Sequence, residues 1–189
     1  MEHDTLEHID HAPGLRGPRR GLVIVHTGDG KGKSTAAYGL ALRALGRGKK
    51  VKIFQFSKPG SARVGEYRAF ARLGLPVEVL GGRFDWECRD AEHCALEIGR
   101  SWALARTAIG GGEHFMIVLD DITVALRRGW IALDELLLVL QQRPHAVHVV
   151  LTGRNAPQDL IDLADTVTCM SLTKHHHMAG VPAQRGIED

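Results

Sequence analysis

A glycine-rich segment contains the residues best suited to chemistry. Its members, in order, are Thr27, Gly28, Asp29, Gly30, Lys31, Gly32, Lys33, Ser34 and Thr35. Glycines let backbone N–H groups converge on an anion, a lysine adds a full positive charge, and a serine hydroxyl can bind a phosphate-bound magnesium ion. The segment therefore predicts a site for the phosphates of a nucleoside triphosphate, with Lys33 and Ser34 at its centre.

The spacing departs from the usual phosphate-binding loop at one position. The pattern G-x-x-x-x-G-K-S would place its first glycine at position 27, where this chain has Thr27, and the glycine follows at Gly28. The loop is therefore one residue tighter between its outer glycines. It can still hold phosphates, but it need not hold them in the register that hydrolases use.

Alternating apolar runs and helical patterns must position this loop. An apolar run at 22–25 precedes it, and a helical pattern follows from residue 36 to about 46. Near-continuous apolar strands between helices are typical of an α/β fold with a mostly parallel central sheet and helices on both faces. Residues 1–20 are polar and predict a flexible tail before a single domain at 21–189. Further strands are predicted at 51–56, 76–80, 115–120, 145–152 and 166–170, and further helices at 90–109, 131–142 and 157–164.

Other polar residues follow the ends of the predicted strands. Asp120 and Asp121 follow one apolar run, and Arg154 follows another after a glycine. Ligands of parallel sheets bind at the carboxyl ends of the strands, so these residues are expected beside the loop. A carboxylate there can hold magnesium opposite Ser34, and Arg154 can bind phosphate. Lys58, after the second strand, is a similar candidate, although a plain surface role for Arg154 or Lys58 stays open.

Composition excludes several classes of protein. The 189 residues carry a net charge of only +2, whereas nucleic-acid-binding domains usually show a strong basic excess. The longest apolar runs are too short to cross a membrane. Three cysteines, an odd number without C-x-x-C spacing, fit a reducing compartment. We therefore expect a cytoplasmic protein that binds neither nucleic acid nor membrane.

Two further groups of residues could serve either the structure or a ligand site. Phe84 and Trp86 follow a Gly-Gly-Arg segment, and they could fill the local core or form the wall of a flat apolar ligand site. Composition favours the core. Cys88, Cys94 and the histidines at 175–177 lack the spacing of a structural zinc site.

Taken together, these features resemble the ATP:corrinoid adenosyltransferases of the BtuR/CobO/CobA type, from about residue 21 to residue 189. The shortened phosphate loop is typical of that family. The resemblance is carried by T-G-D-G-K-G-K-S-T-A-A-Y-G at 27–39, F-D-W-E at 84–87, L-T-G-R-N-A at 151–156 and K-H-H-H-M-A-G-V-P-A-Q-R-G-I-E-D at 174–189.

The resemblance implies a RecA-like P-loop fold and an enzyme that transfers the 5′-deoxyadenosyl group of ATP to the cobalt of a reduced corrinoid, releasing triphosphate. It implies that Lys33, Ser34 and Asp121 serve catalysis, with Mg²⁺ held by Ser34, Asp120 and Asp121. It implies nucleotide contacts for residues 27–35, Lys58 and Arg154.

For the corrinoid, the resemblance implies that Phe84 and Trp86 help to remove the lower axial ligand from cobalt. This implied role replaces the core position that composition favours. It further implies a homodimer that acts in cobalamin biosynthesis or salvage, with a flavoprotein as a candidate reductant. The sequence does not determine which corrinoid is the acceptor.

The chain departs from the family pattern at two places. Family members usually carry Asp-Glu where this chain has Asp120-Asp121, and residues 1–20 do not look like the longer N-terminal helix that closes over the corrinoid in many members. Two alternatives therefore stay open. One is a P-loop NTPase or kinase that releases ADP, and the other is a non-catalytic member that binds a corrinoid or a nucleotide.

Overall fold

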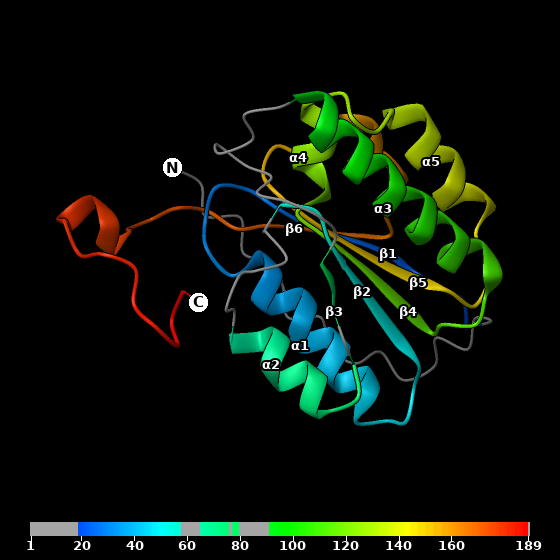
Figure 1. Ribbon diagram of the computed structural model, residues 1–189, viewed down its shortest axis with the longest axis horizontal. Coiled ribbons are helices and arrows are strands. Elements are labelled where there is room, and N and C mark those ends of the chain that lie inside the picture. Colours follow the sequence, from blue (N-terminus) through cyan, green and yellow to red (C-terminus); the bar gives the residue numbers. More distant parts are fainter. Residues whose placement is uncertain (1–18, 58–64, 76, 80–90, 189) are drawn as a thin grey trace, which may run out of the picture.

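A six-stranded, entirely parallel sheet forms the centre of the protein (Figure 1). The computed structural model describes residues 19–57, 65–75, 77–79 and 91–188. The strand order is β3-β2-β4-β5-β1-β6, so β1 lies between β5 and β6. The α/β class predicted from the sequence is confirmed. The strands are β1 (Val23–Thr27), β2 (Val51–Gln55), β3 (Val77–Val79), β4 (Met116–Asp120), β5 (His148–Thr152) and β6 (Thr166–Cys169).

Helices cover both faces of this sheet, as Figure 1 shows. The elements are α1 (Lys33–Leu45), α2 (Gly65–Arg72), α3 (Ala91–Gly111), α4 (Ile122–Arg127), α5 (Leu133–Gln142), α6 (Gln158–Leu163) and a final 3-10 turn, η1 (His176–Ala179). Apolar side chains alternate between the two faces of each central strand. On β1, Val23 and Val25 pack towards α3 and α5, and on β5, Val150 packs towards α1. Each face thus has its own core, which fixes the sheet between two helical layers.

Most predicted elements are present, with local corrections. The strand predicted from residue 145 begins only at His148, because the backbone N–H of Val147 turns back to the carbonyl of Pro144. Helix α3 continues through two glycines and ends where Gly112 adopts a positive φ of 69°. The sequence missed α2, α4 and η1, which are short and polar or lie directly after a strand.

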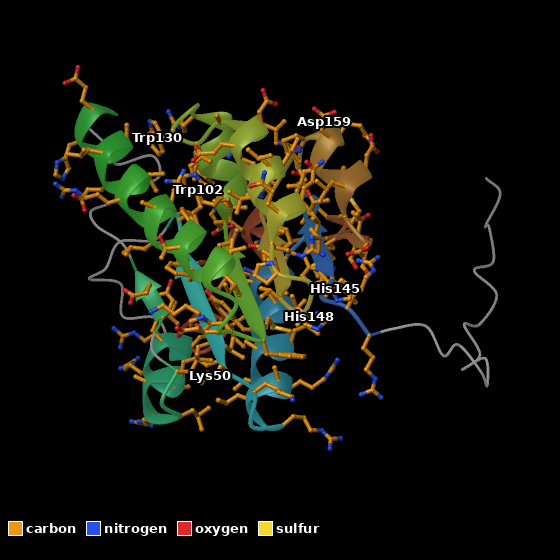
Figure 2. The ribbon with its side chains drawn as sticks, turned by 90° about the vertical axis from the view of Figure 1, so that its right-hand side faces the viewer. Lys50, Trp102, Trp130, His145, His148 and Asp159 are labelled. Atoms are coloured by element: carbon orange, nitrogen blue, oxygen red, sulfur yellow. The ribbon has the colours of Figure 1, made fainter. Side chains whose placement is uncertain are left out.

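Figure 2 shows residues at the two ends of the parallel strands. Lys50, His145 and His148 lie where strands begin, whereas Trp130 and Asp159 lie near the opposite edge, where strands end. The glycine-rich segment follows β1 at that second edge. Within the part of the chain described, none of the helices combines the length and apolar character needed to span a bilayer.

The start of the described chain is attached to the domain. Arg20, which the sequence assigned to the tail, forms an ion pair with Asp165, and the backbone N–H of Val23 donates to the same carboxylate at 2.8 Å. Residues 1–18 lie outside the described residues. Cys169 has a free thiol, whereas Cys94 is disulfide-bonded, which departs from the expected set of reduced thiols.

Candidate functional site

The glycine-rich segment forms a tight loop between β1 and α1. Gly28 and Gly32 adopt positive φ angles of 93° and 106°, a region in which other residues are strained. Gly32 is the N-cap of α1 and supplies no side-chain hydrogen bond, so the amides of the first helical turn are not capped by a side chain. A helix N-terminus of this kind attracts anions, because its amides and its dipole both favour negative charge.

The chain beyond β6 lies directly against this loop. The N–H of Gly30 donates to the carbonyl of Met170 at 2.7 Å. A side chain at Gly28 or Gly30 would begin 2.5 or 2.6 Å from the backbone oxygens of Met170 and Ser171, respectively, so both positions require glycine. The loop and residues 169–172 therefore form one packed unit.

Lys33 is the buried cation of the loop. Its side chain is only 9% exposed, and its ammonium donates to the carbonyl of Gly30. Burial lowers the pKa of Lys33, and the charge of Arg154 lowers it further, while Asp121, Asp29 and Cys169 act in the opposite direction. Lys33 therefore lies within electrostatic reach of four groups, which come from the loop after β1 and from the ends of β4, β5 and β6.

Thr27, the residue that replaces the first glycine of the usual pattern, has a structural role. It is buried, and its hydroxyl oxygen accepts a hydrogen bond from the backbone N–H of Ala156 at 3.1 Å. This contact joins the end of β1 to the segment after β5 that includes Arg154. The threonine thus ties two parts of the site together.

Asp120 lies at the end of β4 in a fully buried network. Its two carboxylate oxygens accept hydrogen bonds from Tyr38 on α1 (2.7 Å) and from Thr152 on β5 (2.6 Å). Burial, followed by the charge of Asp120, raises the pKa of the Tyr38 hydroxyl well above its usual value, so Tyr38 stays protonated and donates. Asp120 therefore links α1, β4 and β5 behind the loop.

Asp121 has an unusual backbone and a partly buried side chain. It adopts a left-handed conformation with φ 58°, and its N–H donates to Thr152 Oγ1 at 2.8 Å. It occupies the N-cap of α4, but its side chain makes no capping hydrogen bond. Instead its carboxylate accepts a hydrogen bond from Ser57, just after β2, at 2.6 Å.

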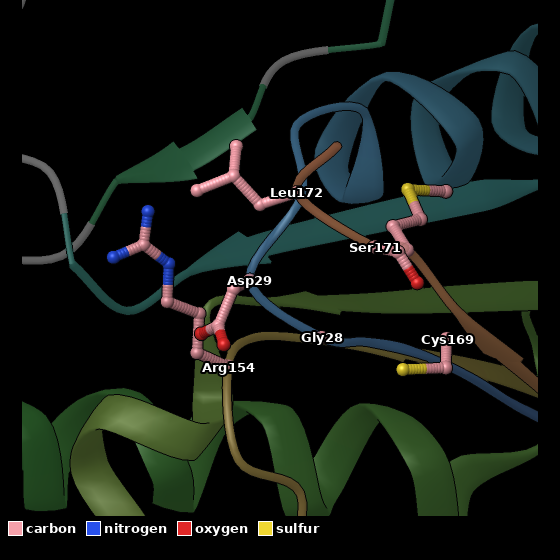
Figure 3. Close-up of a pocket in the computed structure, with 7 residues that line it drawn as sticks. Gly28, Asp29, Arg154, Cys169, Ser171 and Leu172 are labelled. Atoms are coloured by element: carbon pink, nitrogen blue, oxygen red, sulfur yellow. The ribbon is translucent and has the colours of Figure 1, made fainter. Parts of the chain in front are cut away.

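A pocket opens between the loop, Arg154 and the chain after β6 (Figure 3). Its volume is about 500 Å³, within the range of small-molecule sites. Asp29 and Arg154 lie at one end of this pocket and Cys169 at the other, as Figure 3 shows. The pocket is lined by Gly28, Asp29, Arg154, Cys169, Met170, Ser171 and Leu172.

The structure brings most of the predicted nucleotide residues together. The loop residues 27–35, Asp121 and Arg154 all lie at the carboxyl edge of the sheet. Lys58, Phe84 and Trp86 lie outside the described residues. Among residues 19–57, 65–75, 77–79 and 91–188, no three His, Cys, Asp or Glu side chains group as a metal cluster.

Comparison with known proteins shows the family of this chain. A model of the family described as ATP:corrinoid adenosyltransferase BtuR/CobO/CobP matches residues 19–188. The chain belongs to this family. The match includes the loop, both aspartates and the segment after β6, so the whole pocket lies within the adenosyltransferase domain.

Individual adenosyltransferases are similar over most of their length. A corrinoid adenosyltransferase of Pseudomonas aeruginosa is 43% identical over 171 residues, which cover 89% of this chain and 84% of that protein. One from Escherichia coli K12 is 36% identical over 182 residues, covering 96% and 92%. The corrinoid adenosyltransferase CobA of Salmonella typhimurium is 38% identical over 169 residues, covering 89% and 86%.

Sequence reasoning missed several residues of the site. Tyr38, Thr152 and Ser57 form the hydrogen bonds around the two aspartates, and Cys169 and Met170 line the pocket. All of them except Tyr38 lie at or just after the end of a strand. Arg154 was selected because ligands bind at the carboxyl ends of parallel strands, and the same rule could have selected these residues. Tyr38 carried no such signal, because it lies on one face of α1.

Proposed function

We propose that this protein transfers the 5′-deoxyadenosyl group of ATP to the cobalt(I) of a reduced corrinoid and releases triphosphate. The observation that carries the proposal is the family match over residues 19–188, which includes every described strand end that lines the pocket. In the reaction, the electron pair of cobalt(I) forms the bond to C5′ of ATP. The bond from C5′ to the α-phosphate oxygen breaks, and triphosphate leaves with the electron pair of this broken bond.

Cobalt(I) is a strong nucleophile, so the reaction needs no protein base. The protein has two tasks, namely orienting C5′ for in-line attack and stabilising the triphosphate. We assign the second task to Lys33 and to the amides at the start of α1, with residues 27–35 surrounding the phosphates. The buried position of Lys33 supports this assignment, because a charge interacts more strongly where water is excluded. Lys58 and Arg154 are proposed as further nucleotide contacts.

A magnesium ion fits the donor groups at this site. Ser34 is half-buried in the first turn of α1, and Asp121 supplies a carboxylate across from the loop. Mg²⁺ prefers oxygen ligands and is usually held by one or two protein groups together with phosphates and waters. When bound it would neutralise charge on the triphosphate. Asp120 belongs to the same group of predicted metal ligands, but its carboxylate oxygens already accept two hydrogen bonds. We therefore propose that Asp120 supports Asp121 from the buried side of the site.

The corrinoid side of the site rests on the resemblance. Phe84 and Trp86 are proposed to displace the lower axial ligand of cobalt in an apolar pocket. We further propose a RecA-like P-loop fold, a cytoplasmic location, a homodimer and a flavoprotein as reductant, in cobalamin biosynthesis or salvage. The parallel sheet with a glycine-rich loop between β1 and α1 supports the fold assignment.

The products of ATP test the proposal directly. The purified protein would be incubated without oxygen with Mg-ATP and chemically reduced cob(I)alamin. We expect adenosylcobalamin, followed by its light-sensitive absorbance, with an equal amount of triphosphate by chromatography. Lys33→Ala should lose at least about a hundredfold in rate, since one buried charge on the leaving group is removed. The control is Lys50→Ala, an exposed lysine at the opposite edge of the sheet.

Three outcomes would contradict the proposal. Accumulation of ADP without an adenosylated product would identify an NTPase or kinase. Binding of ATP and corrinoid without turnover of cobalamin, cobinamide or earlier corrinoids would identify a non-catalytic family member. Equal rates for Lys33→Ala and the control would show that the loop does not bind the triphosphate.

A further inference from the structure

We propose that Ser57 is a positioning residue for the metal-binding carboxylate of Asp121. The inference rests on the proposed function, because it concerns the divalent ion that accompanies ATP. Ser57 lies just after β2, outside the glycine-rich loop and outside the motifs described above. Its hydroxyl donates to Asp121 Oδ2 at 2.6 Å, a length typical of a hydrogen bond from a hydroxyl to a carboxylate.

The conformation of Asp121 shows that its side chain is not used to stabilise its own helix. An aspartate at an N-cap usually accepts a hydrogen bond from the backbone N–H of the second or third residue of the helix. Asp121 makes no such bond, although it occupies the N-cap of α4. Its positive φ of 58° turns the residue, and its carboxylate reaches the end of β2 instead. Backbone strain of this kind is often found at functional sites.

Ser57 is itself held in place by a buried side chain. Gln55 is fully buried at the end of β2, and its Oε1 accepts the backbone N–H of Ser57 at 2.7 Å. Gln55 Nε2 lies 3.2 Å from the Ser57 hydroxyl and 3.5 Å from Asp121 Oδ2. The serine hydroxyl is therefore presented to Asp121 from a rigid support.

Contacts from β5 and from the residues after β2 consequently restrain Asp121. Thr152 accepts its backbone N–H, and Ser57 donates to its carboxylate. Such a restraint matters more for aspartate than for the glutamate usual at this position in the family, because a shorter side chain reaches an ion only from a defined backbone position and rotamer. Hydrogen bonds to a ligating carboxylate orient it, and losing one typically weakens metal binding by about 10- to 100-fold.

Binding of Mn²⁺ in the presence of ATP tests this inference without any corrinoid. The full-length protein would be titrated with Mn²⁺ and followed by electron paramagnetic resonance. We expect Ser57→Ala to weaken Mn²⁺ binding by about tenfold, and Ser57→Thr, which keeps the hydroxyl, to restore most of it. The matched control is Ser101→Ala, whose hydroxyl bonds only its own helix α3, to the carbonyl of Glu97 at 2.7 Å. Thermal unfolding of each variant would confirm that it is folded.

A double-mutant cycle separates positioning from a general structural role. In an Asp121→Asn background, Ser57→Ala should cause little further loss of Mn²⁺ affinity, because the carboxylate that it orients is gone. A full tenfold loss in that background would overturn the inference. So would unchanged Mn²⁺ affinity in Ser57→Ala, or an equal loss in Ser57→Thr.

The outcomes also distinguish this inference from the proposed function. If the wild-type protein forms adenosylcobalamin but Ser57→Ala binds Mn²⁺ normally, only the role of Ser57 is wrong. If the wild-type protein binds no Mn²⁺ with ATP, the magnesium site and the role of Ser57 are both wrong. If Mn²⁺ binding depends on Ser57 but the product is ADP, the positioning role stands and the adenosyl transfer does not.

Discussion

Replacing Thr152 by valine should destabilise the protein substantially, although the two side chains have nearly the same shape. Thr152 is fully buried at the end of β5. Its hydroxyl oxygen accepts the N–H of Asp121 at 2.8 Å, and its single proton is donated to Asp120 at 2.6 Å. Valine can make neither bond, so both aspartates lose a partner at once.

The expected size follows from these two losses. A hydrogen bond to a charged group contributes about 1.5–3 kcal/mol, and we take about 2 kcal/mol for the bond to Asp120. An unpaired buried amide costs about 1–3 kcal/mol, and we take about 1 kcal/mol because Asp121 is only partly buried. The sum of about 3 kcal/mol is a large share of the roughly 5–15 kcal/mol that stabilises a typical domain.

Urea unfolding followed by circular dichroism would measure this change in the free energy of unfolding. Thr152→Ser keeps the hydroxyl and loses one methyl group, so it should cost about 1 kcal/mol. Thr166→Val, on the exposed edge strand β6, should stay within about 0.5 kcal/mol of the wild type. A Thr152→Val protein within about 1 kcal/mol of the wild type, or a serine variant as unstable as the valine variant, would refute the reasoning.

Two further predictions concern Gly153 and His26. Gly153→Ala should lower the free energy of unfolding by about 2–5 kcal/mol, because the φ of Gly153 is 141° and the new carbon would lie 2.0 Å from the Thr123 hydroxyl. Gly39→Ala, on the open face of α1, should instead raise the free energy of unfolding by about 0.5–1 kcal/mol. Equal effects of the two substitutions in urea unfolding would contradict this prediction. Burial lowers the pKa of His26 in the folded state, so the unfolded state takes up the proton first as pH falls below about 6.5, and folding stability is lost in that range. Between pH 7 and pH 5, the free energy of unfolding should therefore fall less in His26→Leu than in the wild type or in the exposed control His145→Leu. If the free energy of unfolding of His26→Leu depends on pH as it does in the wild type, His26 does not contribute.

Local signals were sufficient to predict the architecture and the position of the glycine-rich loop. The apolar runs that became β1 and β4 are nearly continuous, and this pattern is typical of strands buried on both faces. The glycine-rich segment follows such a run and opens a helix, which is the context that a phosphate loop requires. Short elements were less predictable. Helix α4 has only six residues and begins directly after the strand that carries Asp120, so no helical period could develop.

The different surroundings of the two aspartates could not be predicted from the local sequence. From their position at the end of an apolar run, both were predicted as metal ligands. The structure gives them different surroundings, because Asp120 points into the sheet between Tyr38 and Thr152, whereas Asp121 turns towards Ser57. The partners come from β2, β5 and α1, which are between 31 and 82 residues away in the chain. No pattern within a short window can contain such pairs.

The fold class, the family and the position of the glycine-rich loop could be predicted from the sequence alone. These depend on hydrophobic periodicity and on glycines at set spacings, which are properties of neighbouring residues. Three contacts are visible only in the folded protein: Thr27 bonds the segment after β5, residues 169–172 pack on the loop, and Ser57 donates to Asp121. These contacts escape local patterns because a parallel sheet brings the carboxyl ends of distant strands together, and hydrogen bonds between them depend on strand order and register.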